Sequence, residues 1–333
     1  MANLLEVDRL QTVFWNGREE LISVDEVSFT LKAGETVGIV GESGCGKSVT
    51  SLSILRLLGQ HGRIKRGEIR FDGDNLAAWP EDKLRRLRGR DISMIFQEPM
   101  TSLNPVFTIG NQLSEMIRQH TGLSRKETRA RAIDMLRKVG LPHAETLMKA
   151  YPHNLSGGMR QRVMIAMALA CKPKLLIADE PTTALDVTIQ AQILELMKEL
   201  RQESGAAIML ITHDLGVVAE MADKVVVMYA GQIVEEADVF SLFREPGHPY
   251  TQGLLQAIPR VTGDHGRLTA IPGAVPSIQR MPAGCRFHNR CNWASERCRT
   301  EAPPLIEAGP EHRVRCWLTA EFATAHKLKE AGA

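Results

Sequence analysis

The sequence TVGIV-GESGCGKS, residues 36–48, decides the fold of this 333-residue chain. Residues 36–40 are typical of a short buried strand, and the pattern G-x-x-x-x-G-K-S follows directly, before a helical pattern that starts at Val49. Glycines let the backbone wrap tightly enough to aim several N–H groups at one anion. The helix N-terminus adds its dipole, Lys47 a positive charge and Ser48 a hydroxyl for Mg²⁺. The stretch predicts phosphate binding by a nucleotide site, and its strand and helix context disfavours the alternative of a simple glycine-rich turn.

A second stretch, LLIADE at residues 175–180, is a buried strand that ends in two acids. Such a strand places its acids at the carboxyl edge of a sheet, beside a phosphate loop. Asp179 would hold Mg²⁺, directly or through water, and Glu180 would polarise the attacking water. Alone the stretch could lead into an ordinary polar loop; paired with residues 41–48 it indicates nucleotide hydrolysis.

A third stretch, LSGGMRQR at residues 155–162, precedes an apolar helical run. Ser156 is a natural N-cap, and Gly157 and Gly158 leave N–H groups open at the helix start. A simple Ser-Gly-Gly cap is the plain alternative. One chain rarely needs two anion sites unless one of them serves a nucleotide that another chain holds. The stretch therefore indicates that two chains pair around the nucleotide.

Apolar runs and helical patterns alternate along the chain. Runs that predict buried strands are residues 36–40, 92–96, 175–178, 208–211 and 225–228. Between them lie helical patterns such as 124–139, where Ser124 and Glu127 form a possible capping box. The alternation predicts an α/β fold with a mainly parallel sheet. Residues from about 100 to 160 lack strand signals and predict a helical insertion, and the Pro-rich sequence after about 245 predicts loops.

Composition narrows the class of protein. Hydrophobic residues make up 44% and charged residues 24%, which are ordinary values for a globular chain. Forty-one Lys and Arg balance 39 Asp and Glu, without the basic excess typical of nucleic-acid binding. Apolar stretches such as 163–170 and 206–211 are too short to cross a bilayer, and the N-terminal residues lack the apolar core of a signal peptide. We therefore expect a cytoplasmic chain, or one held at a membrane by a partner.

Four cysteines, Cys285, Cys291, Cys298 and Cys316, crowd the last fifth of the sequence. Four thiolates in a segment with few apolar residues suit a tetrahedral metal or an iron–sulfur cluster. Their spacing matches neither the C-x₂-C pairs of zinc ribbons nor a ferredoxin pattern, so zinc, a cluster and unligated thiols all stay open. His288 and His312 lie nearby and could stand in as ligands, but the presence of four cysteines favours their being bystanders.

The order of these stretches resembles that of the ATP-binding cassette (ABC) ATPases, the motor subunits of ABC transporters. Residues 41–48 match the Walker A loop, 155–162 the signature and 175–180 the Walker B strand. Gln97 matches the Q-loop, Ala184-Leu185-Asp186 the D-loop and His213 the switch histidine. The resemblance implies an ABC (P-loop NTPase) cassette over residues 4–255, with a helical subdomain at about 100–160, followed by a small Cys-rich, loop-rich extension at 256–333.

The resemblance also implies a site. Two cassettes would face head to tail, each ATP lying between one Walker A loop and the opposite signature. Glu180, His213 and Gln97 would be catalytic, and Ser48, Gln97 and Asp179 would hold Mg²⁺. Phe14 matches the aromatic that stacks on adenine, with Trp15 as a rival. The implied nucleotide contacts are Phe14, Gly41, Glu42, Ser43, Gly44, Cys45, Gly46, Lys47, Ser48, Val49, Gln97, Ser156, Gly157, Gly158 and Asp179.

A narrower resemblance rests on QEPMTSLNP at 97–105, HPYT at 248–251, IPG at 271–273 and the four cysteines. These segments are similar to the D-type ATPase of the oligopeptide/dipeptide/nickel importers. This implies a paralogous ATPase subunit in a heterodimer, two transmembrane permeases and an extracytoplasmic solute-binding protein. It also implies peripheral attachment at the cytoplasmic face of the inner or plasma membrane, and a [4Fe–4S] cluster on the four cysteines.

The cargo follows from the same resemblance: di- and oligopeptides, or alternatively nickel, glutathione or another solute. A rival from another class is a soluble ABC ATPase that acts outside transport. Residues 97–105 and the cysteine tail favour transport over that rival.

Overall fold

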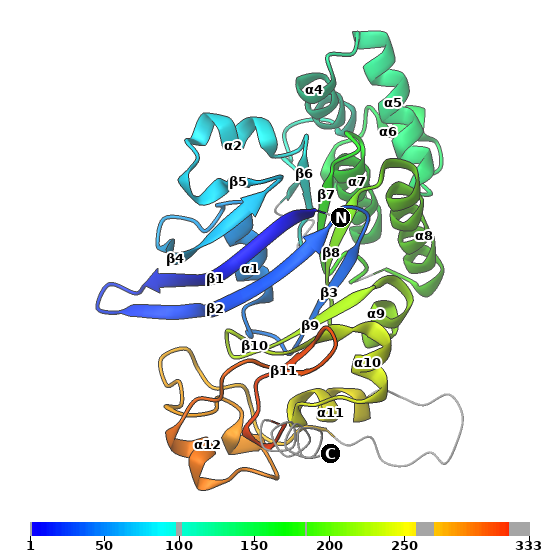
Figure 1. Ribbon diagram of the computed structural model, residues 1–333. Helices are drawn as coiled ribbons and strands as arrows, with labels where there is room; N and C mark the ends of the chain where they lie inside the picture. Colours follow the sequence, from blue (N-terminus) through cyan, green and yellow to red (C-terminus); the bar gives the residue numbers. More distant parts are fainter. Residues whose placement is uncertain (1, 98–101, 184, 258–269, 320–333) are drawn as a thin grey trace. The chain divides into compact units, whose positions relative to one another are not determined.

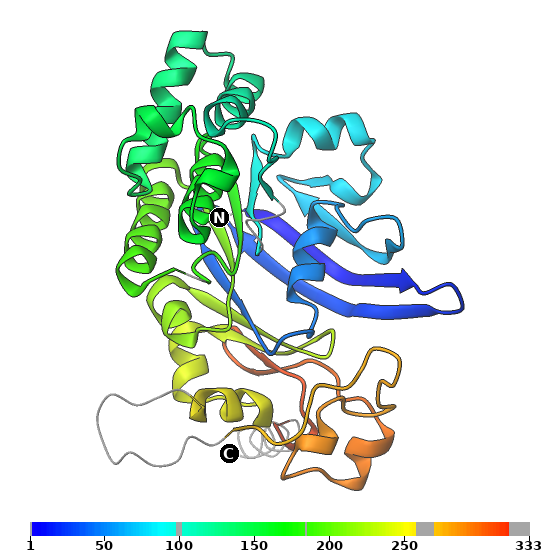
Figure 2. The same ribbon diagram turned by 180° about the vertical axis from the view of Figure 1, so that it is seen from behind.

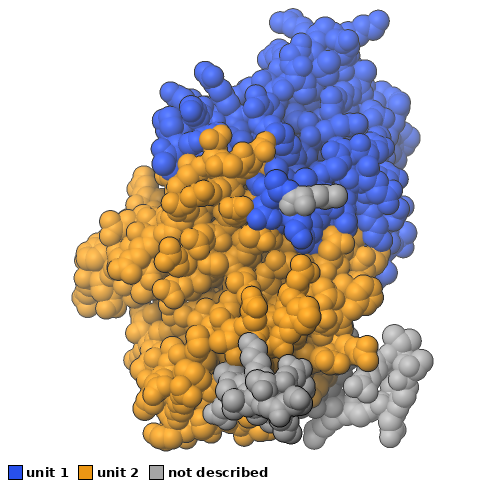
Figure 3. Space-filling model, viewed as in Figure 1, with its two compact units in different colours: residues 1–4, 31–36, 78–211 blue, residues 5–30, 37–77, 212–333 orange. Residues whose placement is uncertain are grey.

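The computed structural model describes residues 2–97, 102–183, 185–257 and 270–319. The chain divides into two compact units (Figure 3). Unit 1 comprises residues 1–4, 31–36 and 78–211, and unit 2 comprises 5–30, 37–77 and 212–333. Among the described residues, none of the helices combines the length and the apolar character that crossing a bilayer requires.

Unit 1 is built on three parallel strands in the order β6 (Ile92–Ile95), β7 (Leu175–Asp179) and β8 (Ala207–Ile211). Every residue of these strands is buried. Continuous apolar runs are typical of parallel strands because both faces of such a sheet are covered. These three predicted strands are confirmed to within a residue or two at their ends.

Helix α7 (Gly157–Leu169) contacts strand β6 of this sheet. Helices α4 (Ile109–Thr121), α5 (Arg125–Lys138) and α6 (Ala144–Leu147) gather at one end of the unit (Figure 1, Figure 2). Ser124 and Glu127 form the predicted capping box at the start of α5. No strand occurs among the described residues of 102–160, which agrees with the expected helical insertion. The other α-helices described in unit 1 are α2 (Glu81–Leu87) and α8 (Val187–Ser204).

Unit 2 contains most of a sheet that the sequence analysis did not anticipate. Its strand order is β2 (Glu20–Lys32), β1 (Asn3–Trp15), β4 (Gly62–Phe71) and β5 (Asp74–Asn75). Strand β1 pairs with β4 in antiparallel fashion. Buried and exposed residues are mixed along these strands, as expected where one face of an antiparallel sheet meets water. They therefore lack the continuous apolar runs on which strand prediction relied.

A second set of strands in unit 2 leads to the phosphate loop, the name used below for residues 41–48. Strand β3 (Thr36–Val40) runs parallel to β9 (Lys224–Tyr229), and β10 (Gln232–Asp238) pairs with β9 in antiparallel fashion. The α-helices described in unit 2 are α1 (Lys47–Ile54), α9 (Leu215–Met221), α10 (Val239–Arg244), α11 (Pro249–Gln256) and α12 (Glu296–Thr300). The two predicted strands, at 36–40 and 225–228, are both present.

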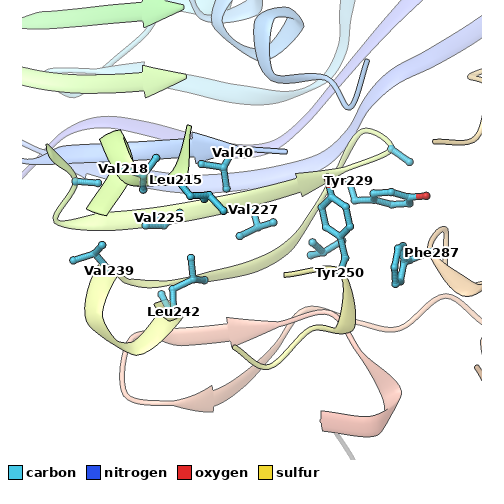
Figure 4. Close-up of a cluster of buried hydrophobic side chains, with 14 residues drawn as sticks. Val40, Leu215, Val218, Val225, Val227, Tyr229, Val239, Leu242, Tyr250 and Phe287 are labelled. Atoms are coloured by element: carbon cyan, nitrogen blue, oxygen red, sulfur yellow. The ribbon is translucent and has the colours of Figure 1, made fainter. Parts of the chain in front are cut away.

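The C-terminal extension shares this part of unit 2. Strand β12 (His312–Val314) pairs with β10, and β11 (Ile306–Gly309) pairs with β12. Phe287 of the extension packs against Tyr229 and Tyr250 in one buried cluster (Figure 4). Much of the described extension is loop, as predicted, and the structure joins it to a sheet and to the cassette's own apolar cluster. The division into domains at 255/256, which coincides with the end of α11, stays a prediction.

Candidate nucleotide-binding site

The phosphate loop has a backbone that only glycine permits at its turning points. Gly41, Gly44 and Gly46 have φ angles of 150°, 79° and 105°. A Cβ on Gly41 would lie 2.2 Å from the carbonyl oxygen of Met228, which belongs to β9. The loop is thus pressed against a neighbouring strand, and a side chain at Gly41 is excluded by contact as well as by conformation.

Lys47 occupies the inside of this loop and is only 7% exposed. Its Nζ donates to the carbonyl oxygens of Gly41 and Glu42, at 2.7 and 3.0 Å. Helix α1 starts at Lys47 with Gly46 as its N-cap, and no side chain caps its first N–H groups. A buried ammonium, a curled backbone and an uncapped helix N-terminus fit a polyphosphate, as the sequence predicted.

The far side of the phosphate loop is held by residues that sequence reasoning gave no such role. The N–H of Glu42 donates to Tyr250 Oη at 2.8 Å, and the N–H of Gly231 donates to the carbonyl of Cys45 at 2.9 Å. The Glu42 carboxylate accepts two hydrogen bonds from Arg290, at 2.6 and 3.0 Å. Burial raises the pKa of Tyr250, which keeps its hydroxyl protonated. An arginine between two cysteines of a Pro-rich tail carries no sequence signal for this contact.

The other predicted residues of unit 2 lie at strand ends. His213 is exposed, and Thr212 before it donates its N–H to Ile39 of β3 at 3.3 Å. Phe14 is half-buried beside Gly62, where an added Cβ would lie 2.7 Å from its ring. Trp15 is 52% exposed. The choice of Phe14 over Trp15 as the adenine platform stays a prediction.

Unit 1 places the two acids of the Walker B stretch in different settings. Asp179, the last residue of β7, is 3% exposed. Glu180 follows with a φ of 49°, rare for a residue with a side chain and worth about 1–3 kcal/mol of strain. Its N–H donates to Ile211 of β8, and Thr183 donates to its carboxylate at 3.0 Å. The fold therefore holds Glu180 in a strained turn, a feature that clusters at active sites.

The signature segment, residues 155–162, starts α7 as predicted. Ser156 Oγ accepts from the N–H of Met159 at 3.3 Å. Gly157 is exposed, and no atom lies within 4 Å of the position where its Cβ would be. Gln161 Nε2 donates to Pro181 O at 2.9 Å, while a Cβ on Gly158 would lie 3.6 Å from Leu185. Unit 1 thus packs the start of α7 against the segment that follows Walker B.

The candidate residues are divided between the units. Unit 2 holds the phosphate loop, Phe14 and His213; unit 1 holds Gln97, the signature segment, Asp179 and Glu180. Gln97 is exposed after β6. Asp186 of the D-loop caps α8 by accepting from Ile189 N–H at 3.0 Å. Residues 98–101 of the Q-loop segment and Ala184 of the D-loop lie outside the described residues.

The four clustered cysteines line one cavity of about 90 Å³, the cysteine cavity, together with His288, Phe287 and two tryptophans. None of the four forms a disulfide. Burial, with the neighbouring cysteines, raises the pKa of Cys285 to about 11, and burial raises that of Cys291. His312 is engaged by Glu235 at 2.7 Å rather than by the cavity.

Among the described residues, no group of three or more His, Cys, Asp or Glu is placed to hold a metal ion. The four thiols as placed therefore do not converge on a single metal ion. Four thiols around a common cavity are nonetheless the donor set that an iron–sulfur cluster uses.

Comparisons with known proteins agree with this geometry. Residues 24–183 match the ABC transporter family, and residues 234–298 match the C-terminal region of oligopeptide/dipeptide transporters. The oligopeptide transport ATP-binding protein AppD of Bacillus subtilis is 55% identical over 96% of this chain and 98% of its own. The dipeptide transport ATP-binding protein DppD of Escherichia coli is 51% identical over 94% and 96%.

Among solved structures, the dimeric post-hydrolysis state of the cassette MJ0796 bound to ADP and Pi has a TM-score of 0.65 and 29% identity, covering 71% of this chain and 98% of that one. The cbiO1 subunit of Clostridium perfringens has a TM-score of 0.60 and 29% identity, over 74% and 92%. The predicted ABC cassette fold is confirmed. The chain therefore belongs to the ABC transporter ATPases, in the group that carries the oligopeptide/dipeptide transporter C-terminal region.

Proposed function

We propose that the chain couples ATP hydrolysis to the uptake of di- and oligopeptides. The match of residues 234–298 carries this proposal, because the family that they match is described as the C-terminal region of oligopeptide/dipeptide transporters. Relatives named for oligopeptide and dipeptide transport, at 51–55% identity, support it. The chain would work at the cytoplasmic face of the membrane, with a paralogous ATPase subunit, two permeases and a solute-binding protein.

The phosphate loop would bind the ATP phosphates through its N–H groups and Lys47. Ser48, Asp179 and Gln97 would hold Mg²⁺, which supplies charge neutralisation at the phosphates. Glu180 would accept a proton from the attacking water as its oxygen bonds to the γ-phosphorus. The bond from that phosphorus to the bridging oxygen of ADP breaks, which yields ADP and phosphate. His213 would contact the γ-phosphate, and Phe14 would stack on adenine.

The signature segment would complete the site of the partner cassette rather than its own. Its support is the geometry of α7: a capped but exposed helix N-terminus, with open space around Gly157. A helix N-terminus stabilises negative charge, and the charge to be met here develops on the transferred phosphoryl group. Binding of ATP would close the pair of cassettes and hydrolysis would open it.

For the C-terminal extension we propose a [4Fe–4S] cluster on Cys285, Cys291, Cys298 and Cys316. What supports this proposal is that the four cysteines line one cavity, since four thiolates are the ligand set of such a cluster. Anaerobic purification with iron, sulfide and zinc analysis tests it, with Cys291→Ser as the variant and Cys171→Ser, outside the cavity, as the matched control. About four irons and four sulfides per chain, lost only in Cys291→Ser, is the expected result. Stoichiometric zinc, or no metal, contradicts it.

Transport itself is tested in liposomes that hold the complete complex, purified with its own permeases, with ATP inside and the solute-binding protein outside. Uptake of a labelled dipeptide that depends on ATP and disappears in Glu180→Gln is expected. Uptake of nickel or glutathione, with no dipeptide uptake, would replace peptide as the cargo. Tight binding of the purified chain to DNA or ribosomes at physiological salt would instead favour a role outside transport.

A further inference from the structure

The seven residues CRFHNRC, 285–291, face two sites at once. The cysteines at the two ends line the cysteine cavity. The two arginines between them contact the cassette: Arg286 pairs with Asp25 and donates to the Ala230 carbonyl, and Arg290 pairs with Glu42 of the phosphate loop. Phe287, between the arginines, is fixed in the aromatic cluster with Tyr229 and Tyr250 (Figure 4).

Arg290 is a buried cation with its side chain 4% exposed. Besides its two bonds to Glu42, it donates to the carbonyl oxygens of Pro272 and Ile271, at 2.7 and 3.2 Å. The hydrogen bonds between Arg290 and Glu42 raise the pKa of Arg290, so the guanidinium stays charged. Two parallel bonds to one carboxylate fix its orientation as well as its charge.

Glu42 places a carboxylate in a loop that is assigned to polyphosphate binding, and a carboxylate repels anions. Its side chain is 32% exposed, so its charge is only partly screened by water. Burial raises the pKa of Cys45 inside the loop, and the charge of Glu42 adds to this. Left unpaired, it would oppose each negative charge of the nucleotide, and most strongly the three phosphates of ATP.

We propose that Arg290 is a positioning residue of the nucleotide site: it holds and neutralises the Glu42 carboxylate, and so makes the C-terminal extension part of the ATP-binding machinery. The inference rests on the proposed assignment of residues 41–48 as the phosphate loop. It assigns the extension a function in the cassette that is independent of any group bound in the cysteine cavity.

The test is nucleotide affinity of the full-length chain, measured with fluorescent ATP, ADP and adenosine analogues. Arg290→Met removes the charge and keeps similar bulk. We expect ATP affinity to fall about tenfold, ADP affinity to fall less and adenosine affinity to stay unchanged. In steady-state hydrolysis, the KM for ATP should rise while kcat changes little. The loss should shrink at high salt, because screening weakens the repulsion from Glu42.

Two further variants separate charge from packing. Glu42→Gln combined with Arg290→Met removes both charges and should restore ATP affinity to near the wild-type value. Arg286→Met is the matched control, since it removes a neighbouring buried guanidinium that pairs with Asp25 instead of the phosphate loop. It should leave the dependence on phosphate number unchanged, even if it lowers the melting temperature.

An equal loss for ATP, ADP and adenosine, or a double variant no better than Arg290→Met, overturns the proposal in favour of a packing role. Should Arg290→Met not fold, Glu42→Gln alone decides: ATP affinity equal to or above wild type supports the proposal, and a loss contradicts it. Lys47→Ala identifies the other possible failure, because full ATP binding in that variant would overturn the assignment of the phosphate loop itself.

Discussion

The phosphate loop and the signature segment both start a helix with glycines, yet the protein holds them very differently. The phosphate loop has three glycines at positive φ, a buried lysine inside it, and Tyr250 and Arg290 behind it. The signature segment has one weak cap from Ser156, and open space surrounds Gly157.

This difference shows which site is complete. A loop that is braced on its outer side and filled on its inner side by Lys47 binds its ligand with little reorganisation. A helix start that is exposed and capped by one hydroxyl is instead suited to meet a ligand held by another surface. The contrast agrees with a division of labour in which each chain binds one nucleotide and completes the site of its partner.

The largest effect is expected on turnover, when Glu180, the residue assigned to the chemical step, is changed. Glu180→Gln keeps the size of the side chain but removes the base, so kcat should fall by about 10²–10⁴. Nucleotide affinity at the phosphate loop should not fall, and the variant should accumulate as an ATP-bound pair of cassettes. Phosphate release and gel filtration with ATP measure the two effects. Unchanged turnover would remove Glu180 from its assigned role.

Adding one methyl group to the phosphate loop and one to the signature segment tests the comparison directly. Gly41→Ala places a Cβ 2.2 Å from Met228 O in a backbone with φ of 150°, so unfolding free energy should fall by about 1–3 kcal/mol or more and ATP binding should be lost. Gly157→Ala meets no atom within 4 Å and should leave unfolding and ATP affinity unchanged.

If the signature segment meets the partner's nucleotide, as proposed, Gly157→Ala should nonetheless reduce turnover of the assembled pair, because the added methyl group lies at this exposed helix start. Thermal unfolding and nucleotide titration, followed by phosphate release from the complete complex, check both variants. If Gly157→Ala weakens ATP binding to the isolated chain, the signature segment serves its own nucleotide and the contrast fails.

The contact of Tyr250 with the phosphate loop involves a buried histidine, His248, and we therefore expect stability to depend on pH. His248, 1% exposed, accepts the N–H of Tyr250 on Nδ1 at 3.0 Å, which places the tyrosine that contacts Glu42. Burial lowers the pKa of His248 from 6.5 to about 4; Arg315 adds to this and Glu235 opposes it. The unfolded chain therefore binds this proton more readily, and acid favours unfolding.

The contribution of His248 should be complete above pH 6.5 and be lost as pH falls toward about 4, a change of roughly 3 kcal/mol in unfolding free energy. His248→Asn keeps an oxygen to accept from Tyr250 but cannot titrate, so its stability should vary less over this interval. Denaturant unfolding at several pH values measures it. Parallel curves for the two proteins would remove His248 from the account.

The sequence predicted the parts of this protein whose signal is local. Lys47, Ser156 and the Ser124–Glu127 capping box follow from spacing along a few residues, and the structure places each as expected. Buried parallel strands were equally accessible, because continuous apolar runs such as 175–178 mark them.

The parts that were missed depend on contacts far apart in sequence. Arg290 and Glu42 are 248 residues apart, and Tyr250 and Glu42 are 208 apart, so no pattern in either segment announces the contact. The mixed polarity of β1 and β4 hid the antiparallel sheet, and two short strands, β11 and β12, were hidden in a Pro-rich tail. A tail poor in apolar residues proved to depend on the cassette for its core.

The smallest effect is expected at Ser156, where two variants separate helix capping from contact with the partner's nucleotide. Ser156→Ala removes the oxygen that accepts from Met159, so unfolding free energy should fall by about 1 kcal/mol or less, since the bond is long at 3.3 Å. Ser156→Asp restores a cap of equal quality and should recover that stability. The same carboxylate, exposed at the helix start, would repel a nucleotide presented by the partner, so turnover should fall further while stability returns. Denaturant unfolding and phosphate release from the complex measure the two quantities separately. Stability and turnover that rise and fall together across the three proteins would mean that Ser156 is only a cap, because an uncoupled response is what a surface that serves another chain's ligand requires.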